Sequence, residues 1–124
     1  MILDPCPNSP NCVSTQAPAS DTVHYVEPIA YSGRRDALRD YLVEWISSQP
    51  RARVTSSGPD TITAEFRSRI FRFVDDVVIV LPVDTPMVHL RSASRVGYGD
   101  MGVNRHRYEQ IRDAVNKWQS ERAE

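Results

Sequence analysis

The stretch from Arg91 to Glu109 contains the side chains best suited to chemistry in this sequence. Its sequence, RSASRVGYGDMGVNRHRYE, alternates arginines with small hydroxyl residues, turns at three glycines and ends in a run of basic residues. Guanidinium groups bind carboxylates and phosphates in a bidentate geometry, and acidic neighbours can orient them. The pattern therefore points to recognition of an anion. Fourteen of the fifteen basic residues in the chain are arginine, which fits this interpretation but is also typical of a GC-rich genome.

Strand parity places further arginines on the same side of a sheet. Arg67 and Arg69 share one face of a predicted strand, and Arg91 and Arg95 share one face of another. The candidate binding residues are these arginines, the polar residues close to them in sequence and the first arginine of the last helix: Arg67, Arg69, Arg91, Arg95, Asp75, Asp76, Asp100, Asn104 and Arg105. The alternative is an ion-pair lattice on a solvated face, in which each exposed pair contributes about 0–1 kcal/mol.

Catalytic signatures are weak throughout the chain. Asp75 and Asp76 are adjacent in a predicted strand, so their carboxylates point to opposite faces and cannot act as one acid–base pair. His24, His89 and His106 lack the spacing of a metal triad. The sequence has no Gly-x-Ser-x-Gly motif and no phosphate-binding loop. These observations favour a binding protein over an enzyme, and they predict no metal site and no cofactor.

The two cysteines, Cys6 and Cys12, are separated by five residues, two of them proline. This spacing fits neither a zinc ribbon nor a Cys-x-x-Cys redox motif. Three states remain open: a small disulfide loop worth about 2 kcal/mol, two free thiols as in a cytoplasmic protein, or a soft-metal clip completed by His24. A thiol- or metal-dependent protein centred on this pair is the alternative to anion binding, and a structural protein-docking module is a third hypothesis.

Composition limits the class of protein. A chain of 124 residues with 40% hydrophobic and 25% charged residues is typical of one soluble globular domain, here residues 1–124. The net charge of −1 argues against nucleic acid and leaves an anionic small molecule or an acidic protein surface as expected partners. The longest apolar run, 77–81, is far shorter than the roughly 20 residues of a membrane span. Residues 1–5 show no secretion signal, which predicts a cytoplasmic protein.

Two amphipathic helices are expected to position these residues. Ser32 should cap the first and Pro50 should end it, and the second should begin near Asn104. Apolar residues at three- and four-residue spacing form their buried stripes: Ala37, Leu38, Tyr41, Leu42, Trp45 and Ile46, then Tyr108, Ile111, Val115 and Trp118. Residues 105–107 put positive charge at the positive end of the second helix, which costs about 0.3–1 kcal/mol per exposed charge and predicts an anion or carboxylate nearby.

Four short strands are predicted between the helices, at 51–56, 61–69, 77–81 and 87–95. The alternation fails after Arg69, so a bulge or tight turn is expected at 68–72. Hairpin-length connections imply an α+β fold, with a four-stranded antiparallel sheet, two helices packed on one face and the arginines on the other. Residues 1–33 contain five prolines and are expected to form an irregular N-terminal segment packed on the core.

Five motifs in order give the chain a resemblance to a known family. They are CPNSPNCVS at 6–14, His24, AEFRS at 64–68, FVDDV at 73–77, and RSASRVG at 91–97 followed by DMGVNR at 100–105. Together they resemble the bacterial and plastid family called domain of unknown function 1499. The family has no established activity, so the resemblance implies no reaction or substrate. Its members often carry a lipoprotein signal or a membrane anchor, which implies an exported or membrane-associated compartment and favours the disulfide.

Overall fold

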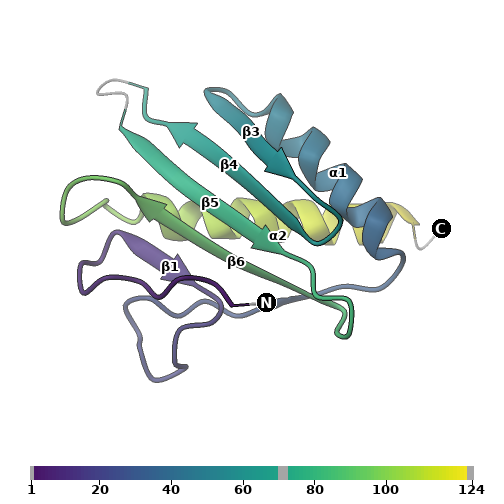
Figure 1. The fold of residues 1–124 in the computed structure, drawn as a ribbon, viewed down its shortest axis with the longest axis horizontal. Helices are drawn as coiled ribbons and strands as arrows, with labels where there is room; N and C mark the ends of the chain where they lie inside the picture. Colours follow the sequence, from purple (N-terminus) through teal and green to yellow (C-terminus); the bar gives the residue numbers. More distant parts are fainter. Residues whose placement is uncertain (1, 70–72, 123–124) are drawn as a thin grey trace.

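Two helices and six strands form an α+β fold in the computed structural model, which describes residues 2–69 and 73–122. Their order along the chain is β1 (Cys12–Ser14), β2 (Ile29–Ala30), α1 (Arg35–Ser48), β3 (Ala52–Ser57), β4 (Thr61–Arg67), β5 (Val74–Val80), β6 (Met87–Ser94) and α2 (Val103–Arg122). The strands β3 to β6 form a meander of antiparallel hairpins, as the short connections predict. Figure 1 shows the sheet in front, with α2 running behind it and α1 beside β3.

The sheet has six strands where the sequence predicts four. The strand order is β1-β6-β5-β4-β3, and β2 also pairs with β6. Both additional strands come from the Pro-rich segment 1–33, so that segment is not irregular throughout. β1 lies between Pro10 and Pro18, where three consecutive residues keep their N–H groups and pair with 91–93 of β6. Proline therefore limits these strands to two or three residues at the sheet edge but does not prevent them.

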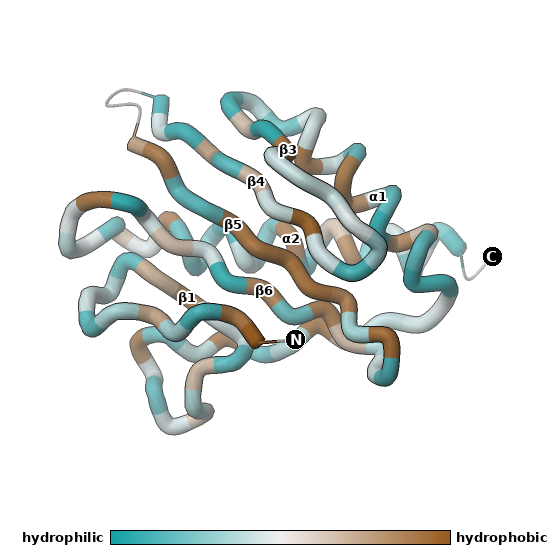
Figure 2. Tube along the Cα trace, viewed as in Figure 1, coloured by the Kyte–Doolittle hydropathy of each residue, from teal (hydrophilic) through white to brown (hydrophobic). Residues whose placement is uncertain are grey.

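The core lies between the two helices and one face of the sheet. Alternate residues of β4, β5 and β6 are buried on that face, and so are the apolar stripes of both helices. The helix residues with no more than 6% exposure in this core are Leu38, Leu42, Ile46, Tyr108, Ile111, Val115 and Trp118. β5 lies at the centre of the sheet, and its second half, Val77–Val80, is the sheet's longest continuous hydrophobic run (Figure 2). The opposite face carries no helix and is called the open face below.

Several local expectations need correction. The N-terminal cap of α1 is Arg34, without a side-chain hydrogen bond, and Ser32 lies two residues before it, with its backbone N–H donating to Oε1 of Gln119. Trp118 is 2% exposed, but Trp45 is only partly buried and packs at the side of the core. A register shift occurs between Val54 and Ser56 of β3. The irregularity expected at 68–72 falls largely on residues 70–72, which lie outside the described residues.

Candidate functional site

Glu65 lies at the centre of a polar cluster on the open face. Its two carboxylate oxygens accept hydrogen bonds from Nη2 of Arg53 at 3.1 Å and from Nη2 of Arg95 at 2.7 Å. Nη2 of Arg67 lies 3.6 Å from the same carboxylate. The guanidiniums of Arg53 and Arg95 lower the pKa of Glu65. Because these groups come from β3, β4 and β6, only the folded sheet gathers them around one carboxylate.

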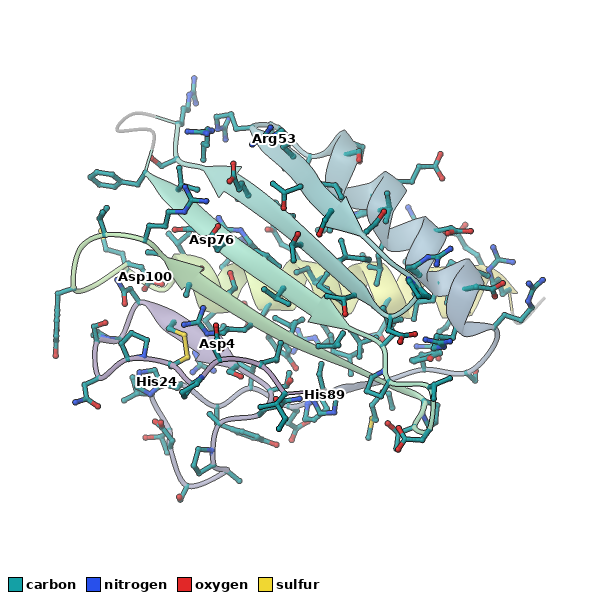
Figure 3. All side chains as sticks on the ribbon, in the orientation of Figure 1. Asp4, His24, Arg53, Asp76, His89 and Asp100 are labelled. Carbon is teal, nitrogen blue, oxygen red and sulfur yellow. A yellow bond between two sulfur atoms is a disulfide. The ribbon has the colours of Figure 1, made fainter. Side chains whose placement is uncertain are left out.

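Arg95 also holds a second carboxylate, that of Asp76 on β5. Its Nε and Nη2 atoms donate to the two Asp76 oxygens at 2.7 and 2.8 Å, which is a bidentate pair. This pair and the contact with Glu65 raise the pKa of Arg95 further. Figure 3 shows Asp76 and Arg53 on the same side of the sheet. We call Arg53, Glu65, Arg67, Asp76 and Arg95 the open-face cluster.

Arginines extend this cluster along one end of the sheet. The backbone N–H of Arg67 donates to the carbonyl of Arg51, Arg67 pairs with Val74, and the N–H of Arg95 donates to the carbonyl of Val74. This ladder places Arg51 next to β3, Arg67 on β4 and Arg95 next to β6 at one end of the sheet, with Val74 of β5 between Arg67 and Arg95. Arg69 lies exposed two residues beyond Arg67. We call Arg51, Arg53, Arg67, Arg69 and Arg95 the basic end. With Glu65 and Asp76 its formal charge is +3, while that of the whole chain is −1.

A second polar group is buried on the opposite side of the sheet. Asn104, at the start of α2, is 0% exposed, and its Nδ2 donates to the carbonyl of Asn11, to Oγ of Ser94 and to Oδ2 of Asp100. Its Oδ1 accepts from Oγ of Ser92 at 2.6 Å. We call Asn11, Ser92, Ser94, Asp100 and Asn104 the Asn104 network. It joins the N-terminal segment, β6 and α2, so every member has a structural task.

Asp75 and Arg107 form an ion pair beside this network. Nη1 of Arg107 donates to Oδ2 of Asp75 at 2.7 Å and to Oδ1 of Asn104 at 3.2 Å, and both charged side chains are largely buried. The guanidinium carbon of Arg107 also lies 4.6 Å from the ring centroid of Phe66. The opposite directions of Asp75 and Asp76 agree with their adjacent positions in a strand.

The basic start of α2 is balanced by carboxylates of the protein itself. Asp100 accepts from the backbone N–H groups of Gly102 and Asn104, as a carboxylate at a helix N-terminus does. Arg107 is neutralised by Asp75. Arg105 turns away from both and donates to the carbonyls of Val23 and Tyr25 in the N-terminal segment. The charges expected to indicate an external anion therefore have internal partners.

The predicted site residues therefore separate into groups. Arg67, Arg95 and Asp76 come together in the open-face cluster, and Arg69 lies near them. Arg91 lies on the open face but under the N-terminal segment, where its Nη2 donates to the carbonyl of Pro5. Asp75, Asp100 and Asn104 belong to the buried side, and Arg105 binds backbone carbonyls. The nine residues do not converge on one cleft.

The sequence prediction omitted two arginines of the basic end, Arg51 and Arg53. Arg53 alternates with the half-buried Ala52 and Val54, so its direction was readable from the strand pattern. Its position opposite Glu65 depends on the β3–β4 register, which the sequence does not specify by itself. Arg51 has a positive φ of 58° at the turn into β3, a conformation that no local pattern predicts for arginine.

The Sγ atoms of Cys6 and Cys12 are 2.03 Å apart, the distance of a disulfide, so of the three states considered the protein has the bridge. His24 supports the bridged loop by donating from Nε2 to the carbonyl of Ser9 and from Nδ1 to Asp21. These two contacts, first that with Ser9, raise the pKa of His24, and the His24 contact lowers the pKa of Asp21. Within residues 2–69 and 73–122, no three His, Cys, Asp or Glu residues are placed to hold a metal ion.

Comparison with known families gives one assignment. The family described as protein of unknown function DUF1499 matches residues 2–115 of the 124 residues. The chain belongs to this family. The match includes the open-face cluster, the Asn104 network and the disulfide loop, so all three lie within the part of the chain that characterises DUF1499. No curated protein and no solved structure matches the chain. In the described part of this DUF1499 protein, no helix has the length and hydrophobicity needed to cross a membrane.

Proposed function

We propose that this protein is a non-catalytic binding module that holds an anionic partner at its basic end. The observation that carries the proposal is the concentration of five arginines at one end of the sheet, three of which contact the carboxylates of Glu65 and Asp76: Arg53, Arg67 and Arg95. All five are exposed, in contrast to Arg107, which is buried against Asp75. A concentration of positive charge in a chain with net charge −1 attracts anions to this end in particular.

The two carboxylates support binding by orienting the guanidiniums. A guanidinium has five N–H donors, and Arg53 uses one of its nitrogens to contact Glu65. Arg51 donates from Nε to the carbonyl of Arg67, and its two terminal nitrogens have no hydrogen-bond partner among the described residues. The cluster therefore has donors that remain available after its internal bonds are made. Groups already held in place lose less conformational entropy when a carboxylate or phosphate binds.

The alternative centred on the cysteines has less support, because both sulfurs are joined in the disulfide. Chemistry at a free thiol would first require reduction of this bond. The third hypothesis, a module that docks to another protein, needs a surface of its own. The exposed apolar residues of the 96–103 segment are the surface feature on which such docking would depend.

The proposal is tested by titration with inorganic pyrophosphate, followed by amide chemical shifts. We expect shifts at residues 51–53, 65–69 and 95. The double variant Arg51→Ala/Arg67→Ala should weaken pyrophosphate binding by at least about tenfold, since the loss of even one charge-assisted hydrogen bond costs roughly 1.5–3 kcal/mol. Added salt should weaken binding in the wild type.

The matched control is Arg34→Ala, which removes an exposed arginine at the start of α1 whose one ion pair within the described residues is with Asp36. This variant should bind pyrophosphate as the wild type does. Equal weakening by Arg34→Ala and by the double variant would show that only net charge matters. Absence of shifts at the basic end of the wild-type protein would overturn the proposed function.

A further inference from the structure

The loop between β6 and α2 exposes apolar side chains that no part of the described structure covers. Tyr98 is 72% exposed, Met101 is fully exposed, and Val96 and Val103 are about half exposed. Phe73, immediately before β5, is 52% exposed. Single exposed apolar residues are ordinary, but several within one loop and its neighbouring turn indicate a surface that meets a partner.

These side chains lie at the same end of the sheet as the arginines. The backbone N–H of Arg95 donates to the carbonyl of Val74, the first residue of β5. Val96 follows Arg95 in the chain and Phe73 precedes Val74, so both apolar residues lie next to this hydrogen bond. The N–H of Ser68 bonds to the carbonyl of Phe73, which joins Phe73 to the residue between Arg67 and Arg69. Figure 2 shows hydrophobic segments both at the start of β5 and in the loop after β6, at this end of the sheet.

The backbone of the loop is held in place from inside the protein. Nδ2 of Asn11 donates to the carbonyl of Gly97 at 2.8 Å, and the Asp100 carboxylate accepts from the N–H groups of Gly102 and Asn104. Met101 has a φ of 56°, in the left-handed region that methionine rarely adopts. The Asn104 network therefore holds the loop in a conformation in which Met101 protrudes instead of folding back onto the protein.

We propose that this end of the molecule docks on the surface of an anionic lipid bilayer. This rests on the proposed anion binding and names its partner: the basic end contacts lipid phosphates while Tyr98 and Met101 enter the interfacial layer. Tyrosine is favoured at this depth because its ring is apolar and its hydroxyl stays hydrated. Arginines beside an anionic leaflet add electrostatic attraction. A bilayer accepts side chains that protrude separately, whereas a protein partner would need a pocket for each.

The first test is co-sedimentation with vesicles of equal parts phosphatidylglycerol and phosphatidylcholine, and with vesicles of phosphatidylcholine alone. The wild type should bind the first and not the second. Tyr98→Ser/Met101→Ser should lower the affinity for the anionic vesicles by about tenfold or more, because burial of apolar area contributes to interfacial binding. Circular dichroism and melting temperature should be unchanged, since both side chains are exposed.

The matched control is Val83→Ser, which removes a valine that is 77% exposed in the turn between β5 and β6. It should bind anionic vesicles as the wild type does. Equal loss in Val83→Ser and in the loop variant would overturn the assignment of the contact to the 96–103 loop. Unchanged binding of the loop variant would overturn insertion of its apolar side chains.

Pyrophosphate titration distinguishes failure of lipid docking from failure of the proposed function. The loop variant should retain the pyrophosphate response, and Arg51→Ala/Arg67→Ala should weaken both pyrophosphate and vesicle binding. A wild type that binds pyrophosphate at the basic end but not anionic vesicles would overturn lipid docking alone. A wild type that binds vesicles of phosphatidylcholine equally well would contradict the role of charge.

Insertion is measured directly with an environment-sensitive fluorophore on Met101→Cys, attached without reductant so that the Cys6–Cys12 disulfide stays closed. Its emission should increase and shift to the blue on anionic vesicles. The same fluorophore on Val83→Cys should not change. A label at residue 101 that stays in a fully aqueous environment on vesicles that bind the protein would overturn insertion.

Discussion

The open-face cluster and the Asn104 network are polar groups that meet at the end of β6, where Arg95 belongs to the first and Ser94 to the second, yet they are in opposite environments. Arg95 and Asp76 in the first keep 47% and 41% of their side-chain surface exposed, while Asn104 in the second is completely buried. The arginines of the first are exposed and have N–H donors that the cluster itself does not use. The second is centred on an amide whose donors and acceptor are all occupied within the protein.

The difference between the two regions follows from strand alternation. Asp75 and Asp76 are neighbours in the chain, as are Ser94 and Arg95, but each pair is divided between the two faces of the sheet. On the face covered by helices, polar side chains form hydrogen bonds and ion pairs within the protein, because a buried polar group without a partner lowers the stability of the fold. The uncovered face leaves them available to a ligand. Similar composition thus has different consequences on the two sides.

The largest expected effect comes from breaking the Asn104 network. Asn104→Ala would leave Oγ of Ser92 without its acceptor, and it would remove the Nδ2 donor from Oγ of Ser94 and from Oδ2 of Asp100. Each buried group left unpaired costs about 1–3 kcal/mol. We expect the variant to lose about 3 kcal/mol or more in free energy of unfolding, measured by denaturant titration.

Asn116→Ala is the matched control, because Asn116 lies on the same helix and is exposed. Its free energy of unfolding should stay within about 0.5 kcal/mol of the wild type. If both variants were equally stable, the Asn104 network would not be the structural part of this comparison.

A pair of single substitutions compares the two faces directly. Asp75→Asn would leave Arg107 buried without its carboxylate, which should destabilise the protein by about 3 kcal/mol. Asp76→Asn removes a carboxylate from the exposed Arg95, which keeps Glu65, and should cost less than about 1 kcal/mol. Thermal melting of the two variants under the same conditions measures the difference. Similar losses would contradict the division into structural and available charges.

The smallest expected effect is the pH dependence of the stability that His24 contributes. His24 contacts the Asn104 network through Ser9. Nε2 of His24 donates to the carbonyl of Ser9, and the hydroxyl of Ser9 donates to Oδ1 of Asn11, a member of the Asn104 network. The pKa of His24 is raised in the folded state, so its contribution is complete below about pH 6.5 and is lost as pH rises through the folded pKa. The pKa of Asp21 is lowered, so its contribution is present above about pH 4 and is lost as pH falls through its folded pKa.

The stability difference between wild type and His24→Gln should therefore be largest in mildly acidic solution and should decrease as the pH rises. Denaturant titrations at intervals between pH 5 and pH 9 measure it. His106→Gln is the control, because His106 is exposed on α2 and contacts no part of the N-terminal segment that the structure describes. A difference that grows toward alkaline pH would show that His24 is neutral in the folded protein.

Much of the fold was predictable because local patterns carry it. The apolar stripes of both helices and the alternation of 61–67 and 87–94 predicted the α+β class and the antiparallel meander. The strands from the N-terminal segment were not predicted, because pairs of two or three residues leave no periodic pattern. Their existence depends on the free edge of β6, which the rest of the sheet creates.

The candidate site was predicted in part for the same reason. The alternation of residues correctly separated Asp75 from Asp76. It could not show that Arg91 lies beneath the N-terminal segment or that Arg105 bonds to that segment, because these contacts join residues 80 or more positions apart. Arg53 reaches Glu65 only through strand register.

The sequence by itself determined which side chains share a face of each element, because the periods of the helix and the strand are properties of the backbone. It also determined that arginine is the dominant basic residue and that only two cysteines are available to pair. The tertiary structure alone decided which arginines are free to meet a ligand. That outcome depends on which sheet face the helices cover, where the N-terminal segment crosses and which carboxylate each guanidinium reaches. Those are contacts between distant residues, and no local pattern specifies them.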